Sequence, residues 1–190
     1  AYAEGEDIRV LRAAQIAIDE VIAFPILVGR TKVIEENIRK LGLRMVHGEN
    51  IEIVDQEHNP SYEDFWKDYY NALKRQGITV EFAQREARRR STLVAAMLVK
   101  FGKADGMLCG TYSGYDVHLE FVKDVIGLKN GHQTFFTLNA LMLEDRNLFI
   151  ADTYVNTNPT AEQLAEMTIL AAEEVRRFGI TPRIALLSHS

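Results

Sequence analysis

The sequence predicts an α/β fold in which a mostly parallel sheet is flanked by helices. Amphipathic helical segments alternate along the chain with short apolar runs bounded by glycine or proline, as in Ile26-Leu27-Val28 before Gly29. A polar turn over residues 144–147 separates two longer apolar runs and predicts one antiparallel hairpin. The sequence contains no internal repeat. Connections between parallel strands of one sheet are nearly always right-handed, so we expect right-handed crossovers.

Two helices frame the first predicted strand. Apolar residues recur at spacings of three and four between residues 6 and 23, which predicts one amphipathic helix there. Pro25 ends this helix, and the strand 26–28 follows. The second helix covers residues 32–41 and ends at Gly42, a residue that readily takes the left-handed conformation of a helix C-cap.

The rest of the chain continues the alternation of helix and strand. In its middle part we expect a strand over 51–54, a helix over 61–77 and a helix over 79–102 that is interrupted near Ser91. Towards the C-terminus we expect a strand over 105–110, a helix over 115–126, hairpin strands over 133–143 and 148–155, a helix over 160–178 and a buried strand over 183–188. Thr160 and Gln163 have the spacing of a capping box, which supports the start of the last helix.

Bulk properties exclude several classes of partner. The net charge of -5 argues against nucleic acid and anionic membranes, and apolar runs such as 92–99 are far shorter than the roughly 20 residues that cross a bilayer. The single Cys109 cannot form an internal disulfide and no signal peptide opens the chain, so we expect a cytoplasmic protein. Because Ala1 replaces an initiator Met and a predicted strand ends the chain, we also expect a fragment.

General motifs indicate little chemistry. The sequence has no Walker phosphate loop, no Gly-x-Gly-x-x-Gly fingerprint and no Gly-x-Ser-x-Gly elbow. Its histidines show no metal-ligand spacing. We therefore predict no metal site and name no catalytic residue.

Two loops and one basic cluster are candidate anion sites. The loop 110–114 links a strand to a helix at the carboxyl edge of the predicted sheet, where backbone N–H groups could hold a phosphate; alternatively its hydroxyls only cap the helix. The loop 156–160 joins a strand to a capped helix, or its side chains only fix a tight turn. The basic cluster is either a clamp for a phosphorylated ligand or a solvated helix face. It consists of Arg85, Arg88, Arg89 and Arg90.

Six segments, in the same order, resemble the phosphate acetyltransferase family. They are residues 4–14, 25–29, 76–79, 103–107, 152–165 and 182–188, and they include Lys103-Ala-Asp-Gly-Met107 and Asn156-Thr-Asn-Pro-Thr160. This resemblance implies two α/β lobes of isocitrate dehydrogenase-like architecture, with acetyl-CoA bound in the cleft between them. It also implies that residues 1–132 are part of the first lobe and that residues 133–190 begin the second, which is incomplete at the C-terminus.

Further motifs are similar to one branch of that family, the C-terminal domain of the large NADP-type bacterial malic enzymes. They are Cys109-Gly-Thr-Tyr112 followed by His118-Leu119, Met142-Leu-Glu-Asp-Arg146, Glu173-Glu-Val-Arg-Arg-Phe-Gly179 and Leu187-Ser-His-Ser190. The resemblance implies an upstream domain that oxidatively decarboxylates malate with NADP and a divalent metal. It implies that the present domain binds acetyl-CoA as an allosteric inhibitor and helps to assemble a homo-oligomer.

One departure from the family bears on activity. After Asp-Gly-Met, transacetylases carry a segment resembling Thr-Ala-Asp-Thr-x-Arg-x-Ala-Leu, whose arginine lies in the active cleft. An alignment without gaps places Glu120 at that arginine, and no Arg occurs between Asp105 and Lys129. A carboxylate there would repel phosphate or pyrophosphate. We therefore favour a regulatory module that binds acetyl-CoA, over an active phosphate acetyltransferase and a purely structural assembly domain.

The candidate ligand residues follow from both lines of reasoning. Five of them lie at predicted strand ends, and two basic residues lie where the resemblance places cations near the cleft. They are Lys74, Arg75, Gly110, Thr111, Ser113, Asn156 and Ser188.

Overall fold

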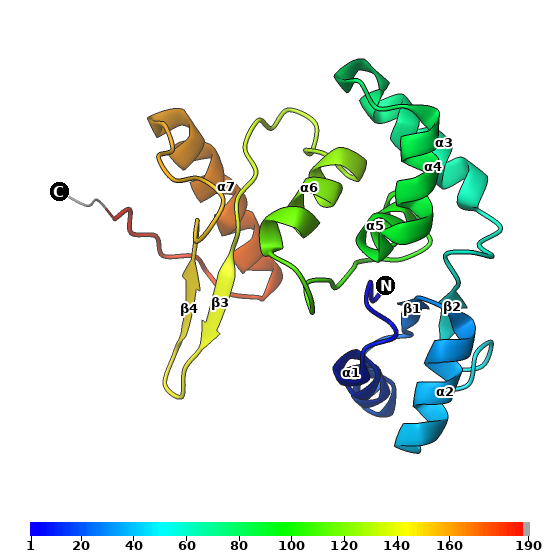
Figure 1. Cartoon of the computed structure of the whole chain (residues 1–190). Helices are drawn as coiled ribbons and strands as arrows, with labels where there is room; N and C mark the ends of the chain where they lie inside the picture. The colour runs from blue at the N-terminus through cyan, green and yellow to red at the C-terminus, as the bar shows by residue number, and fades with distance from the viewer. Residues whose placement is uncertain (188–190) are drawn as a thin grey trace. The chain divides into compact units, whose positions relative to one another are not determined.

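The computed structural model describes residues 1–187, which form mainly helices with two small sheets (Figure 1). The chain divides into two compact units, Ala1–Gly127 and Leu128–Ser190, and each contains one of the sheets. The predicted α/β class is confirmed. The predicted mostly parallel sheet is wrong, because one two-stranded sheet is parallel and the other is antiparallel.

The parallel pair is the centre of the first unit. Strand β1 (Ile26–Val28) pairs with β2 (Glu52–Val54) with Leu27 opposite Ile53. Tyr2 extends the pair by isolated parallel bridges to Leu27 and Leu108. The strand predicted over 105–110 is therefore reduced to a single bridging residue.

Helices α1 (Ile8–Asp19) and α2 (Thr31–Leu41) share one apolar cluster with this pair. Asp7 caps α1, and its carboxylate accepts a hydrogen bond from the Arg9 backbone N–H at 2.7 Å. The helix ends before the predicted residue 23, and Val21 beyond it has a φ of 56°. Gly42 ends α2 with a φ of 64°, which confirms the predicted left-handed cap.

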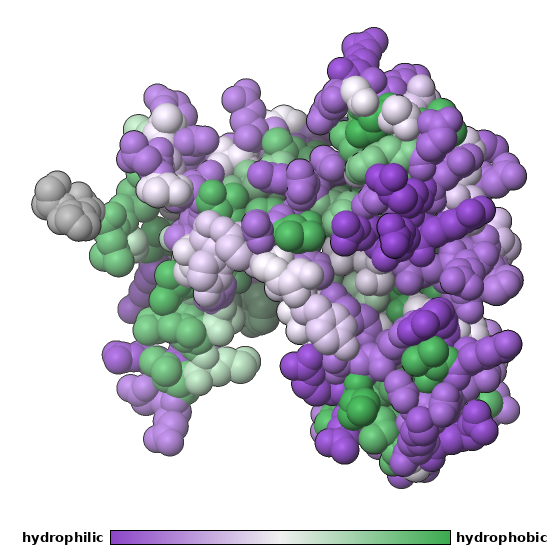
Figure 2. All heavy atoms as spheres, viewed as in Figure 1, coloured by the Kyte–Doolittle hydropathy of each residue, from purple (hydrophilic) through white to green (hydrophobic). Residues whose placement is uncertain are grey.

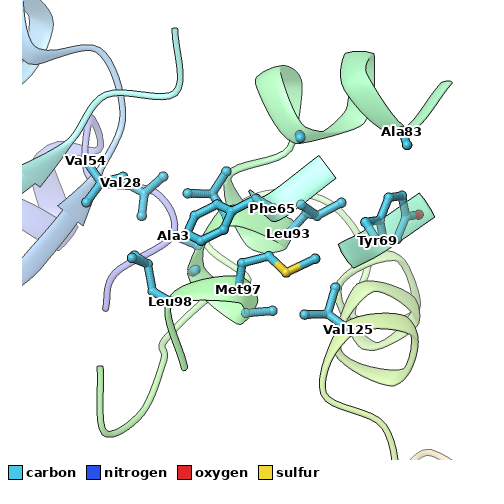
Figure 3. Close-up of a cluster of buried hydrophobic side chains, with 14 of the residues drawn as sticks. Ala3, Val28, Val54, Phe65, Tyr69, Ala83, Leu93, Met97, Leu98 and Val125 are labelled. Carbon is cyan, nitrogen blue, oxygen red and sulfur yellow. The ribbon is translucent and has the colours of Figure 1, made fainter. Parts of the chain in front are cut away.

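The second apolar cluster of this unit surrounds the helix over Ser91–Lys100, which is buried on all sides. The remaining helices are α3 (Tyr62–Leu73), the 3-10 turn η1 (Lys74–Gln76), α4 (Val80–Arg89), α5 (Ser91–Lys100) and α6 (Tyr115–Val125). Every residue of α5 from Thr92 to Leu98 is buried. Figure 3 shows Leu93 and Met97 of α5 packed with Phe65 of α3 in this cluster. Arg90 is extended, which separates α4 from α5 and confirms the predicted interruption.

The second unit contains the hairpin and one long helix. Strands β3 (Asn139–Met142) and β4 (Asn147–Ile150) confirm the predicted hairpin but are shorter than expected. Helix α7 (Ala161–Arg177) begins with the predicted capping box of Thr160 and Gln163. The strand predicted over 183–188 is wrong for residues 183–187, because within the described part of this unit only β3 and β4 pair. Ser188 lies outside the described residues.

Candidate functional site

The loop 110–114 lies between the bridging residue Leu108 and the start of α6. The Gly110 N–H donates to Glu4 Oε1 at 3.1 Å, and the Thr111 hydroxyl lies 3.5 Å from Glu4 Oε2. Two residues of the loop have left-handed backbones, Gly110 with a φ of 102° and Ser113 with a φ of 66°. The predicted candidates Gly110, Thr111 and Ser113 thus lie together in one turn, and a buried carboxylate holds that turn.

A second carboxylate holds the same loop from α1. The Tyr112 hydroxyl donates to Asp7 Oδ2 at 2.5 Å, and the Arg9 guanidinium donates to both oxygens of that carboxylate. The hydrogen bond from Arg9, reinforced by that from Tyr112, keeps the pKa of Asp7 well below its usual range despite burial. The hydrogen bond to Asp7 raises the pKa of Tyr112 in turn. Asp7 is therefore a fixed negative charge beside the loop.

His118 connects the loop to the buried helix α5. Its Nε2 lies 2.6 Å from the Tyr112 carbonyl oxygen, and its Nδ1 lies 2.8 Å from the Thr92 hydroxyl. Because a carbonyl can only accept, Nε2 must carry a proton, and a neutral ring then accepts from Thr92 at Nδ1. This network fixes the loop between α1 and α5, so an entering ligand meets a rigid turn.

The electrostatics of this region are acidic. Cys109 is an exposed residue, but partial burial of its thiol, followed by the nearby Glu4 charge, raises the pKa of that thiol. An anionic ligand at the loop would have to replace Glu4 as the acceptor for the Gly110 N–H and the Thr111 hydroxyl. The donors that the sequence suggested are therefore present but already satisfied.

Further negative charge lies on α6. Glu120 is exposed on this helix, and burial followed by the charge of Glu120 raises the pKa of Asp124. Burial, together with the charges of Asp124, Glu86 and Glu120, raises the pKa of the buried Tyr69 to about 12. The first turn of α6 contains the carboxylate of Asp116 and no lysine or arginine that could pair with a phosphate.

The other candidates lie on separate elements. Lys74 and Arg75 are exposed on η1, where the Lys74 ammonium donates to Asn71 Oδ1 at 2.9 Å. Asn156 belongs to the second unit, and Ser188 lies outside the described residues. The Asn156 side chain donates to Asp152 Oδ2 at 2.6 Å and to the Phe135 carbonyl at 2.7 Å, which fixes its loop.

The arginine cluster is largely engaged within the protein. Arg85 and Arg90 lie 3.4 and 2.9 Å from the buried carboxylate of Glu86. The Arg88 guanidinium lies over the Tyr62 ring, 4.6 Å from its centroid. These contacts favour the interpretation as a packed and solvated helix face.

Sequence reasoning missed the residues that anchor the loop, namely Glu4, Asp7, Tyr112, Thr92 and His118. The partners Glu4 and Gly110, and Asp7 and Tyr112, are separated by 106 and 105 residues. No local spacing could have indicated those contacts. Within residues 1–187, no cluster of three His, Cys, Asp or Glu side chains is arranged to hold a metal ion.

The parallel pair, the helices on either side of it and the loop at the start of α6 define an α/β domain of the class that binds ligands at strand ends. The whole chain, residues 1–190, matches the phosphate acetyl/butaryl transferase family, and the chain belongs to it. The resemblance seen in the sequence is thereby confirmed.

Curated relatives place the chain near one group of proteins. It is 52% identical over 188 residues to the NADP-dependent malic enzyme of Haemophilus influenzae, covering 99% of this chain and 25% of that protein. It is 50% identical to the NADP-dependent malic enzyme of Escherichia coli, and 35% identical to the phosphate acetyltransferase of Nitratidesulfovibrio vulgaris, covering 98% of this chain in both cases. The chain spans about a quarter of the length of these relatives.

Solved structures agree with the family. The chain matches a phosphotransacetylase from Staphylococcus aureus with a TM-score of 0.85 and 26% identity. It matches one from Streptococcus pyogenes with a TM-score of 0.88 and 28% identity. Both matches cover all of this chain and 56% of the other. None of the described helices has the length and apolar character needed to cross a membrane.

Proposed function

We propose that the chain is a regulatory and oligomerising domain of a malic enzyme, and that it binds acetyl-CoA as an allosteric inhibitor. The observation that carries this proposal is the 52% identity to a malic enzyme over nearly the whole chain. In this proposal the upstream part of the protein oxidatively decarboxylates malate with NADP and a divalent metal. The protein would act in the cytoplasm as a homo-oligomer.

The proposed acetyl-CoA site belongs to a domain of isocitrate dehydrogenase-like architecture, whose lobes would begin with residues 1–132 and 133–190. Gly110, Thr111 and Ser113 would contribute the donors of their rigid turn, once the ligand replaces the carboxylate of Glu4. The exposed Lys74 and Arg75 supply positive charge that a pyrophosphate requires. Asn156 and Ser188 remain predicted ligand residues.

Inhibition in this proposal is a case of thermodynamic linkage. Acetyl-CoA lowers malate turnover only if it binds more tightly to a state in which the distant malic domain is less active. Linkage is reciprocal for binding, so malate bound to the upstream domain changes the affinity for acetyl-CoA by the same factor.

The alternative function is a working phosphate acetyltransferase, in which the CoA thiolate attacks acetyl phosphate and positive groups stabilise the developing charge. The 35% identity to a phosphate acetyltransferase favours it. The carboxylates of Asp116 in the first turn of α6 and of Glu120 further along the helix oppose it, because a carboxylate cannot stabilise a phosphate.

The first test measures acetyl-phosphate formation from acetyl-CoA and phosphate by the full-length protein. We expect no turnover while a genuine phosphotransacetylase assayed beside it is active. Enzyme-dependent turnover would establish the transferase and overturn the regulatory proposal. A calorimetric titration with acetyl-CoA then separates a regulatory domain, which binds it, from a purely structural one, which does not.

The second test is the charge reversal Arg75→Glu. If Arg75 faces the ligand's phosphates, we expect acetyl-CoA affinity to fall about tenfold or more, because an attraction becomes a repulsion. Arg12→Glu, at an exposed position of α1, is the matched control and should leave the affinity unchanged. Equal affinities of the two variants would remove Arg75 from the site.

A further inference from the structure

A cavity lined by several charged side chains opens at the carboxyl ends of β1 and β2, within the first unit. Its volume is about 730 Å³, which falls within the range of small-molecule sites. The loop after β1, the loop after β2 and the residues that follow α5 contribute to its lining. Ligands of open α/β sheets bind at this edge. None of the seven residues proposed for acetyl-CoA lines it.

The acidic groups of the cavity are mostly committed to the protein. Asp55 Oδ2 accepts from the Thr31 N–H that begins α2, and Asp55 Oδ1 accepts from the Glu57 N–H, both at 3.0 Å. Glu57 lies near Arg30, whose pKa is raised by the hydrogen bond to Glu6 and further by Glu57 and Asp55. Glu52 also lines the cavity, and it opens β2 at the opposite end of the strand from Asp55.

Two lysines of the cavity differ from these acidic groups, because their ammonium groups have no charged partner among the described residues. Lys32 projects from the first turn of α2, and Lys103 follows α5. The Lys103 ammonium donates to the Ser61 hydroxyl and lies 5.8 Å from the centroid of the Phe65 ring, and both of these partners are neutral. Within the described residues, neither lysine forms an ion pair with a carboxylate.

Two histidines add hydrogen-bond donors. The Ile53 N–H donates to His47 Nδ1 at 3.1 Å, so the neutral ring carries its proton on Nε2. His58 is 80% exposed and its Nδ1 lies 3.5 Å from Asp55 Oδ1. The cavity therefore combines the ammonium groups of Lys32 and Lys103, which have no carboxylate partner among the described residues, with the imidazole rings of two histidines, His47 and His58.

We propose that this cavity binds a small molecule through a phosphate group, with Lys103 and Lys32 as its cationic ligands and His58 as an additional donor. A dianionic phosphate presents several acceptor oxygens, which matches donors converging from separate elements. The volume exceeds that of a lone phosphate and leaves room for a sugar-sized remainder. This ligand is distinct from acetyl-CoA and would act at a second site of the domain.

The test uses the full-length protein and calorimetric titrations with ribose 5-phosphate, inorganic phosphate and ribose. We expect ribose 5-phosphate to bind at one site per chain and ribose not to bind. Lys103→Met and Lys32→Met should each weaken ribose 5-phosphate binding about tenfold, because each removes one charge-assisted contact and keeps the aliphatic chain. Lys100→Met is the matched control, since Lys100 pairs with Asp68 at 2.5 Å outside the cavity, and should bind like the wild type.

Several results would overturn the proposal: no phosphate probe binding below about 10 mM, wild-type affinity in both lysine variants, or competition between acetyl-CoA and ribose 5-phosphate. Lys32 is exposed, so its variant remains informative if Lys103→Met fails to fold. If inorganic phosphate binds as tightly as ribose 5-phosphate, the cavity binds the free phosphate ion, and the proposal of a larger phosphorylated ligand is wrong. An acetyl-CoA titration of the same variants should be unchanged, which keeps this test independent of the proposed function.

Discussion

The carboxylate of Asp152 organises the loop that follows the hairpin of the second unit. Its Oδ1 accepts from the Thr137 N–H at 3.0 Å and the Thr137 hydroxyl at 2.8 Å, and its Oδ2 accepts from the Asn156 N–H at 2.7 Å. Burial alone would raise its pKa, but the bonds from Thr137 and Asn156 outweigh burial and hold the pKa well below the usual value of 3.8.

For Asp152→Asn we expect a loss of about 2 kcal/mol in the free energy of unfolding at pH 7. The NH₂ group of the new amide would face the N–H and O–H groups of Thr137 and Asn156 that now donate to the carboxylate. Since the folded pKa is depressed, the contribution of the charge is complete above the unfolded pKa near 3.8 and is lost as the pH falls below it. Urea denaturation across this range should therefore show the difference between variant and wild type shrinking in acid. Asp145→Asn, an exposed position in the hairpin turn, should show neither effect.

Gly5 is required by a close approach of backbone segments. A Cβ placed there would lie 2.8 Å from the Val28 carbonyl oxygen and 2.9 Å from the Leu27 Cβ, and backbone cannot move aside as a flexible side chain can. We expect Gly5→Ala to destabilise the fold by about 1–3 kcal/mol through overpacking. Thermal unfolding should show no comparable loss for Gly106→Ala, where a Cβ meets nothing within 4 Å; equal midpoints for the two variants would contradict this explanation.

Helix α5 shows how an element can be predicted while its environment is not. Its apolar run predicted a helix correctly, and the interruption before Ser91 was expected as well. Burial on all sides follows from contacts with α4, α6 and β1 and from α3 side chains in the same apolar cluster, and long-range packing of this kind is not visible in the local sequence. The helix therefore supplies more of the buried residues of the larger apolar cluster in the first unit than any other element.

The variant Met97→Ala removes a fully buried side chain from the middle of α5 (Figure 3). We expect a loss of about 2–5 kcal/mol, since the packed neighbours can only partly close the cavity. Met142 on β3 is 81% exposed, so Met142→Ala serves as the control with the same chemical change and should stay near wild type. Chemical denaturation measures both, and a small effect of Met97→Ala would show that α5 can collapse into the space.

Elements whose hydrogen bonds are local were predictable, and those that need a distant partner were less so. The cap at Gly42 and the capping box of Thr160 with Gln163 are set within a few residues, and both were confirmed. The segments 105–110 and 183–187 have apolar sequences typical of strands. A strand also requires a paired neighbour, and the first finds one only at Leu108.

The same reason limits what the sequence says about the candidate site. The loop 110–114 was found from its glycines and its place after a strand, and family resemblance supplied the expected ligand. That Glu4 and Asp7 hold this loop depends on contacts across more than a hundred residues. The site therefore acquires its acidic character from tertiary structure.

The molecule exposes much apolar surface on its second unit. Hydrophobic residues gather along the hairpin and along the segment that follows α7 (Figure 2). Ile184 and Leu186 of that segment are 55% and 70% exposed, and Leu148 of β4 is 43% exposed. Contiguous apolar surface of this kind favours association of protein molecules.

We expect a protein consisting only of residues 1–190 to self-associate and to bind a hydrophobic dye, with the second unit as the cause. The double variant Ile184→Lys/Leu186→Lys should lower both the mean mass measured by light scattering and the dye fluorescence, because two charges interrupt the surface. Val46→Lys places one charge at a single exposed apolar residue of the first unit and should change neither. If the double variant associates as strongly as the parent while Val46→Lys does not, association arises in the first unit, and the apolar surface of the second unit is not what drives it.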